Sequence, residues 1–108
     1  MHTRTSTQVQ KKKHTGNKKV KSLLYQALLT AKSEEECAEL LADLLTPEEL
    51  DRICNRFQAM ILLLDGQKQR QIAKRIGSSV AIVSRANRVL KSEARGIKRA
   101  LNRLQKSF

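Results

Sequence analysis

Basic and hydroxyl side chains are concentrated in one stretch, residues 69–91, with the sequence QRQIAKRIGSSVAIVSRANRVLK. Guanidinium and ammonium groups bind phosphate, and arginine also forms bidentate hydrogen bonds with guanine. Short apolar side chains can contact the methyl group of thymine. The chemistry that this stretch offers is therefore recognition of DNA. The candidate contact residues are Gln69, Arg70, Lys74, Ser78, Ser79, Val80, Ala81, Ile82, Ser84, Arg85 and Arg88.

The spacing of small and apolar residues predicts two short helices that position these side chains. Ile72, Ala73 and Ile76 lie on one face of the first helix. Gly77 can adopt the positive φ that a sharp turn needs, and the small Ala73 lets the two helices approach closely. We therefore predict a helix-turn-helix over about residues 69–91, although a surface helix pair of another all-α protein would have the same pattern. The inner side of the second helix is expected to carry Val80, Val83 and Leu90.

The start of the second helix is expected to face the bases. Either Ser78 or Ser79 can cap it, because a serine hydroxyl accepts hydrogen bonds from the free N–H groups at a helix start. Residues 79–82 would then face the base edges, and Val80 and Ile82 are the candidates for contact with thymine methyl groups. The candidates for phosphate or base contacts are Gln69, Arg70, Ser84, Arg85 and Arg88.

Four further helices are predicted, three before residue 69 and one after residue 92. The first covers about residues 18–31. A capping box, Ser33-Glu34-Glu35-Glu36, opens the second helix, and another, Thr46-Pro47-Glu48-Glu49, opens the third, which ends at Gly66. The apolar stripe of the first helix is Val20, Leu23, Leu24, Ala27 and Leu28, and that of the second is Cys37, Leu40, Leu41, Leu44 and Leu45. The stripe of the third helix is Leu50, Ile53, Cys54, Phe57, Met60, Ile61 and Leu64, and that of the last helix is Ile97, Ala100, Leu101 and Leu104. The other face of the last helix carries Arg95, Lys98, Arg99, Arg103 and Lys106. This face is either a second phosphate-binding surface or only a solvent-exposed one.

The composition favours a small all-α domain. The chain of 108 residues has one Pro, four Gly and three aromatic residues, so its core must consist of aliphatic side chains on helices. The third helix also carries Leu62 and Leu63 outside its stripe and must be enclosed on several sides. A second copy of the chain is the simplest cover, and we expect a homodimer.

Charge divides the chain into three parts. Residues 1–21 have seven basic and no acidic residues, residues 22–66 have three and nine, and residues 67–108 have twelve and one. The positive charge is therefore concentrated on the helix-turn-helix and the segment after it, as expected for a phosphate-binding surface. Residues 1–17 are too polar to order themselves and are predicted to be a disordered basic tail, and residues 18–108 form the helical DNA-binding domain.

Other functional classes are disfavoured. The sequence has no Ser/His/Asp set, no phosphate-binding Gly loop and no paired catalytic carboxylates, so we predict no catalytic residues and no enzyme. We expect no metal site, because His2 and His14 lie in the tail and no CxxC motif occurs. Cys37 and Cys54 are expected to be buried, reduced thiols. No apolar run approaches the roughly 18 residues of a membrane span, and the N-terminus lacks a signal-peptide core. We expect no membrane partner and a cytoplasmic location, on the nucleoid when DNA is bound.

The segment Leu44-Leu45-Thr46-Pro47-Glu48-Glu49, followed by Arg56, Gly66 and a helix-turn-helix ending in Ser84-Arg85, resembles the tryptophan repressor (TrpR) family over roughly residues 20–104. The resemblance implies an intertwined, all-helical homodimer whose two recognition helices enter successive major grooves of a palindromic operator. It also implies a pocket for L-tryptophan as corepressor. The residues of this chain at the ligand-binding positions are Thr46, Arg56 and Arg85.

Three residues depart from the family pattern around that pocket. The small Gly that follows the second arginine is Ala86, a hydroxyl residue is replaced by Val89, and a Thr is replaced by Ile82. The added methyl group of Ala86 would crowd an indole ring, and Val89 would leave a buried ammonium group without a partner. The loop between Gly66 and Gly77 is also one residue shorter. These features resemble the TrpR-like YerC/YecD branch and leave the effector open.

Two functional hypotheses follow. The first is a sequence-specific, dimeric DNA-binding transcriptional regulator, expected to repress from a palindromic operator and to respond to tryptophan if the pocket binds it. The alternative is a non-specific nucleic-acid-binding protein that uses its basic tail and its basic C-terminal half. The role of Arg85 decides whether a ligand can switch DNA binding, because an arginine held against a ligand cannot also contact a base.

Overall fold

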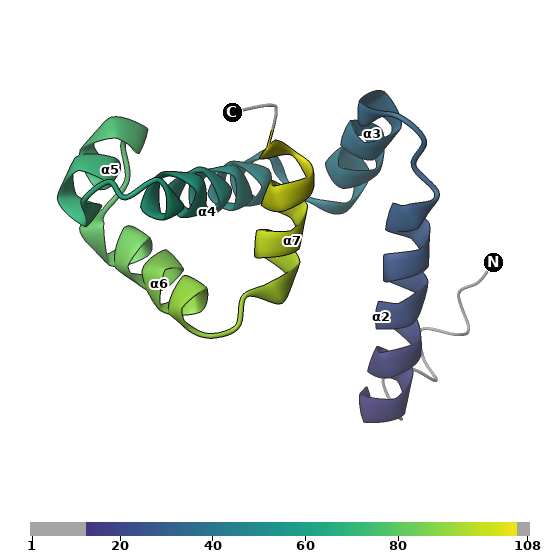
Figure 1. The fold of residues 1–108 in the computed structure, drawn as a ribbon. Coiled ribbons are helices and arrows are strands. Elements are labelled where there is room, and N and C mark those ends of the chain that lie inside the picture. Colours follow the sequence, from purple (N-terminus) through teal and green to yellow (C-terminus); the bar gives the residue numbers. More distant parts are fainter. Residues whose placement is uncertain (1–12, 106–108) are drawn as a thin grey trace. The chain divides into compact units, whose positions relative to one another are not determined.

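The computed structural model describes residues 13–105, which are helical with short connections and contain no strand (Figure 1). This confirms the all-α fold class. The chain divides into two compact units, Met1–Thr46 and Pro47–Phe108. The helices are α2 (Lys13–Leu29) and α3 (Glu34–Leu44) in the first unit, and α4 (Pro47–Leu64), α5 (Gln69–Ile76), α6 (Val80–Lys91) and α7 (Arg95–Arg103) in the second.

The first unit contains two amphipathic helices, α2 and α3. Helix α2 begins at Lys13, within the segment expected to be tail, while residues 1–12 lie outside the described residues. The predicted cap of α3 is confirmed, because the Ser33 hydroxyl accepts a hydrogen bond from the Glu36 N–H at 3.1 Å. The Glu36 carboxylate reaches back as expected, but it accepts from the N–H of Lys32, one residue before the cap, at 2.9 Å.

The predicted buried stripe of α3 is wrong for the single chain. Helix α3 contains no buried residue, and Leu44 is exposed. Cys37, Leu40, Leu41 and Leu45 are only half-buried. Two helices present too little surface to enclose side chains of this size, so the apolar face of this unit stays open to a further partner.

In the second unit, the ends of α4 follow the sequence signals. The helix begins at Pro47, where the missing N–H of proline is tolerated. After its last residue, Gly66 adopts a φ of +90°, and the Gln67 N–H donates to the Leu62 carbonyl at 3.1 Å. This left-handed residue ends the helix and turns the chain toward α5.

The core of the second unit lies where α5 and α6 pack on the C-terminal half of α4. The buried residues are Ala59, Met60, Leu62, Ile72, Ala73, Val83, Ala86 and Leu90. Ile97 of α7 and Ala94 pack against them from the other side. Ile72 and Val83 are fully buried, and they join the two helices of the helix-turn-helix to each other and to α4.

The predicted stripe of α4 is covered along only part of the helix. Met60 is buried as expected, but Leu62, which lies outside the stripe, is buried as well, and Ile53 and Leu64 are exposed. Cys54 is also exposed, contrary to expectation. The reason is that α5 and α6 cover one end of α4, whereas sequence periodicity assumes the same cover along the whole helix. The half-buried members of the stripe are Leu50, Phe57 and Ile61.

Candidate DNA-binding interface

The turn between α5 and α6 is made by Gly77. Its φ of +66° and ψ of +39° lie in the left-handed region, which glycine adopts without the steric penalty of a Cβ. The Ser78 N–H donates to the Ala73 carbonyl at 2.9 Å, and the Gly77 N–H points to the Lys74 carbonyl at 3.4 Å. These bonds close the last turn of α5 and direct the chain into a second helix, as predicted.

Ser79, and not Ser78, caps α6. Its hydroxyl accepts a hydrogen bond from the Ile82 N–H at 3.2 Å, and its backbone is extended, as a helix cap requires. Ser78 is half-buried in the turn. The structure thereby decides between the two serines and fixes Val80 as the first residue of the helix.

The buried side of α6 begins one turn after its start. Val83, Ala86 and Leu90 pack against the core, while Ala73 of α5 is the small contact between the two helices. The prediction that Val80 lines the inner side of α6 is wrong, because 44% of its surface is exposed. As the first residue of α6, it lies a full turn before the point at which the helix meets the core.

The first turn of α6 consequently presents apolar side chains to solvent. Val80 and Ile82 are 44% and 43% exposed, and Ala81 between them is exposed too. Basic side chains are exposed on both helices of the motif, with Arg70 and Lys74 among them on α5. On α6, Arg85 and Arg88 are exposed and Ser84 is half-buried, as is Gln69 at the start of α5.

Arg75 belongs to a different surface. Its Nη1 donates to Oε1 of Gln67 at 3.4 Å, and both side chains line a cavity of about 630 Å³ that also involves Leu101 of α7. The outward basic residues of α5 are thus divided between two sides of the second unit.

A groove between α4 and α6 brings Arg56 and Arg85 together, as the resemblance implied. Its volume is about 280 Å³. Two of its residues, Arg52 and Asn55, are not among the residues predicted from the sequence. Arg52 stands four residues before Arg56, a spacing that places both on one face of a helix and could have indicated it. The remaining lining comes from Ala81 and Ile82.

The residues that depart from the family pattern lie in different places. Ile82 lines the groove, whereas Ala86 is buried in the core and Val89 is exposed on α6; neither of the latter two lines the groove. Thr46 is the last residue of the first unit, whereas the residues that line the groove belong to the second unit.

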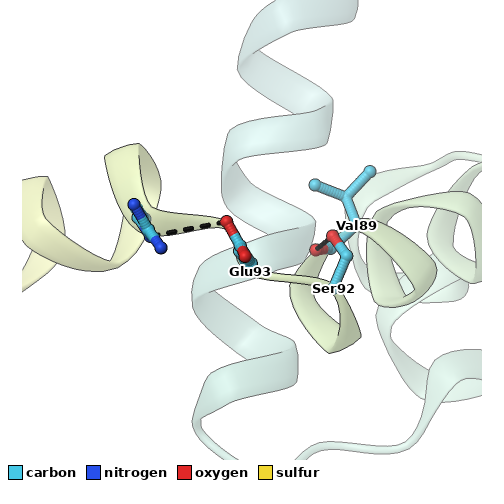
Figure 2. A network of polar contacts seen from close by, with 4 residues as sticks. Val89, Ser92 and Glu93 are labelled. Carbon is cyan, nitrogen blue, oxygen red and sulfur yellow. Dashed lines mark hydrogen bonds and ion pairs between the residues drawn. The ribbon is translucent and has the colours of Figure 1, made fainter.

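Local polar contacts occur at the junction between α6 and α7 (Figure 2). The Ser92 hydroxyl donates to the Val89 carbonyl at 2.6 Å, and the Arg95 Nε lies 3.4 Å from the Glu93 carboxylate. Ala94 takes a left-handed φ of +45°, a conformation that costs a residue with a Cβ roughly 1–2 kcal/mol. Its packing against the core holds it there.

Residues 13–105 show neither a metal site nor a membrane span. No group of three or more His, Cys, Asp or Glu side chains in that range is arranged to hold a metal ion. In the same range, no helix combines the length and the apolar character needed to cross a membrane.

Comparison with known proteins identifies the family. The family model described as Trp repressor protein matches residues 18–105. The protein YerC of Bacillus subtilis is 29% identical over 84 residues, which are 78% of this chain and 81% of YerC. The Trp operon repressor homolog of Vibrio cholerae is 35% identical over 75 residues, covering 68% of this chain and 73% of the homolog.

A solved structure agrees with this assignment. The TrpR-like protein from Eubacterium eligens superposes with a TM-score of 0.74 at 31% identity, over 78% of this chain and 87% of that one. The resemblance drawn from the segment around Thr46 and from the helix-turn-helix is thus confirmed by sequence and by fold. Because the family model matches most of its length, the chain belongs to the Trp repressor family.

Proposed function

We propose that the protein is a sequence-specific transcriptional repressor that binds a palindromic DNA operator as a homodimer. The observation that carries the proposal is the first turn of α6, which is capped by Ser79 and presents Val80, Ala81 and Ile82 to solvent. Arg52, Arg56 and Arg85 line the same groove as Ala81 and Ile82. A capped helix start with exposed apolar side chains fits the edges of bases in a major groove.

The basic residues around this turn would contact the phosphate backbone. Arg70 and Lys74 are exposed on α5, and Arg85 and Arg88 follow the turn on α6. Such contacts set the position of the protein on the duplex, whereas contacts to base edges specify the sequence. The proposed contact set is completed by Gln69, Ser78, Ser79 and Ser84.

A homodimer is supported by apolar surface that the chain leaves open. Leu23 and Leu29 of α2 are 63% and 83% exposed, and Leu44 of α3 is exposed as well. Exposed apolar side chains on amphipathic helices mark a protein interface. Two copies related by a twofold axis would present two α6 helices to half-sites about one helical turn apart, roughly 34 Å.

Control by a ligand is part of the proposal. Arg56 and Arg85 line one groove beside the proposed base-contacting turn, so a ligand bound there would alter the surface that meets DNA. L-tryptophan is the ligand that family membership suggests, because the Vibrio cholerae relative is named as a Trp operon repressor homolog.

Selection of bound sites from random duplex DNA tests this function. We expect enrichment of a palindrome with two half-sites, and selection repeated with L-tryptophan shows whether the amino acid is needed. Recovery of unrelated sequences, together with complete loss of binding to excess random duplex at physiological salt, would refute sequence-specific repression.

A non-specific nucleic-acid-binding protein is the second candidate, and the exposed basic face of α7 favours it. Arg95, Lys98, Arg99 and Arg103 are all exposed on that helix, which is not part of the helix-turn-helix. In this case, loss of Arg99 would weaken DNA binding as much as loss of Arg70, since a diffuse cationic surface makes no distinction between them.

A further inference from the structure

The first turn of α6 exposes apolar side chains within a strongly basic part of the chain. Val80 and Ile82 are 44% and 43% exposed, and Ala81 between them is exposed as well. Residues 67–92, which include the whole helix-turn-helix, contain seven basic residues and no acidic residue. This charge complements the phosphate backbone of duplex DNA, so the occupant expected on the apolar turn is a base edge.

The turn has few polar side chains with which to recognise a base. Val80, Ala81 and Ile82 have neither a side-chain hydrogen-bond donor nor a side-chain acceptor. The Ser79 hydroxyl is engaged as the helix cap, because it accepts the Ile82 N–H at 3.2 Å, and Ser78 is half-buried in the turn before it. Side-chain contact between this turn and a base is therefore made by methyl and methylene groups.

Pyrimidines present two different groups in the major groove. Thymine has an O4 acceptor and a methyl group on C5, whereas cytosine has an N4 donor and a hydrogen on C5. An apolar side chain gains free energy by covering the methyl group, but it forms no hydrogen bond with either O4 or N4. On this edge, 5-methylcytosine has the methyl group of thymine and the N4 donor of cytosine.

We infer that the first turn of α6 recognises the 5-methyl group of a pyrimidine and is indifferent to the polar group beside it. At the contacted positions, 5-methylcytosine then substitutes for thymine, whereas cytosine and uracil do not. The inference deepens the proposed function and rests on it, since it names the class of base that an operator half-site presents to Val80 and Ile82. Duplex DNA methylated at cytosine thereby becomes a second substrate class for the same surface.

Replacement of thymine by deoxyuridine tests the recognition of the methyl group, because deoxyuridine lacks this group and keeps every hydrogen-bonding group of thymine. Each thymine of the palindromic duplex obtained by selection is replaced in turn, and the affinity of the full chain is measured by competitive gel shift. We expect the affinity to fall about fourfold for each contacted methyl group, the worth of one buried methylene-sized group.

Methylation of cytosine separates the methyl group from the rest of the base. A contacted T·A pair is changed to C·G, and this duplex is compared with one that carries 5-methylcytosine at the same position. We expect the methyl group to raise the affinity about fourfold here too, because the same side chains cover it in both base pairs. No loss with deoxyuridine, or no gain with 5-methylcytosine, would mean that the polar group is recognised instead and would overturn the inference.

Val80→Ala and Ile82→Ala assign the effect to this turn. Each variant removes apolar surface, so the ratio of thymine to deoxyuridine affinity should fall from about four toward one at the position that the side chain contacts. Val89→Ala is the matched control, because Val89 is 42% exposed on the same helix, seven residues after Ile82, and it should keep the ratio. Circular dichroism checks that all three variants fold. An unchanged ratio in both Val80→Ala and Ile82→Ala, or an equal fall in Val89→Ala, contradicts the assignment.

Failure of the inference is distinguishable from failure of the proposed function. A selected palindrome that tolerates deoxyuridine at every thymine leaves the repressor in place and removes the recognition of methyl groups. If selection returns no preferred sequence, the repressor fails, and alternating dA-dT and dA-dU duplexes decide the methyl preference by themselves. Tighter binding of dA-dT then supports the inference, and equal binding of the two duplexes excludes it.

Discussion

At the scale of single residues, the helix-turn-helix depends on a few backbone and hydroxyl groups. Ser79 fixes the first residue of α6, and Gly77 provides the left-handed turn before it. Arg70 stands exposed on α5 and has no hydrogen bond or ion pair with another described residue. The first two determine where the helix starts, and the third is free to contact a phosphate.

Replacement of Ser79 by alanine should destabilise the protein by about 1 kcal/mol, because the Ile82 N–H loses its acceptor. Urea denaturation measures the change. Ser78→Ala is the control, since the hydrogen bond made by Ser78 comes from its backbone N–H and is retained. A larger loss of stability in Ser78→Ala than in Ser79→Ala would contradict the assigned cap.

Replacement of Arg70 by alanine should weaken binding to all DNA sequences. The slope of log K against log salt concentration should become shallower by about 0.9, the value for one phosphate contact on duplex DNA. Gel-shift titrations over a range of salt concentrations measure it. Arg99→Ala removes an equal charge on α7 and should leave the slope unchanged; equal slopes for the wild type and Arg70→Ala would exclude the contact.

At the scale of elements, α6 is defined by what covers it. Its buried side meets α4 and α5 at Val83, Ala86 and Leu90, while its first turn extends beyond the core and is exposed. Ile72 of α5 and Val83 of α6 are both buried in the core that these helices form with α4. The angle between α5 and α6 is therefore set by this packing together with the turn at Gly77. A change in the turn is therefore a change in the position of the whole of α6.

Gly77→Ala should destabilise the protein by roughly 1–2 kcal/mol. No atom lies within 4 Å of the added Cβ, so the cost comes from the left-handed φ of +66° alone. Gly96→Ala is the matched control, because Gly96 lies in α7, has equally open surroundings and has no positive φ. There alanine should stabilise by about 0.5–1 kcal/mol.

Thermal or urea denaturation of the two glycine variants provides the comparison. Equal effects at both positions would mean that the backbone strain at Gly77 does not determine the cost.

At the scale of the whole molecule, buried and exposed apolar residues are unevenly distributed. The buried residues of the described chain come from α4, α5 and α6, whereas α2 and α3 keep large apolar side chains exposed. A second copy that covered these side chains would stabilise the chain, and its apparent stability would then depend on protein concentration. The proposed twofold operator requires the same assembly.

Sedimentation velocity should therefore give a mass of twice 12.3 kDa, and the melting temperature should rise with protein concentration. Leu23→Lys on α2 should shift the equilibrium toward monomer, since Leu23 is 63% exposed in the single chain. Gln26→Lys adds the same charge at another exposed position of α2 and should keep the dimer. A monomeric wild type, or equal dissociation in both variants, would contradict this interface.

The sequence by itself determined the starts of α3 and α4 and the turns after α4 and α5, because the signals for them are local, whereas α2 begins earlier than the predicted residue 18. A serine three residues before Glu36, a proline at position 47 and glycines at 66 and 77 each act on the backbone within one turn, and the structure has the corresponding helix starts and turns. The motif around these positions also indicated the family, which the comparisons confirm.

Tertiary structure alone decided which side chains are buried and which come together. Leu62 and Ala86 are in the core and Val80 is not, because burial depends on where a partner helix ends, and periodicity within one helix carries no such information. The groove of three arginines is a further case. Arg52 and Arg85 are 33 residues apart in the chain and meet only because α5 and α6 fold back along α4.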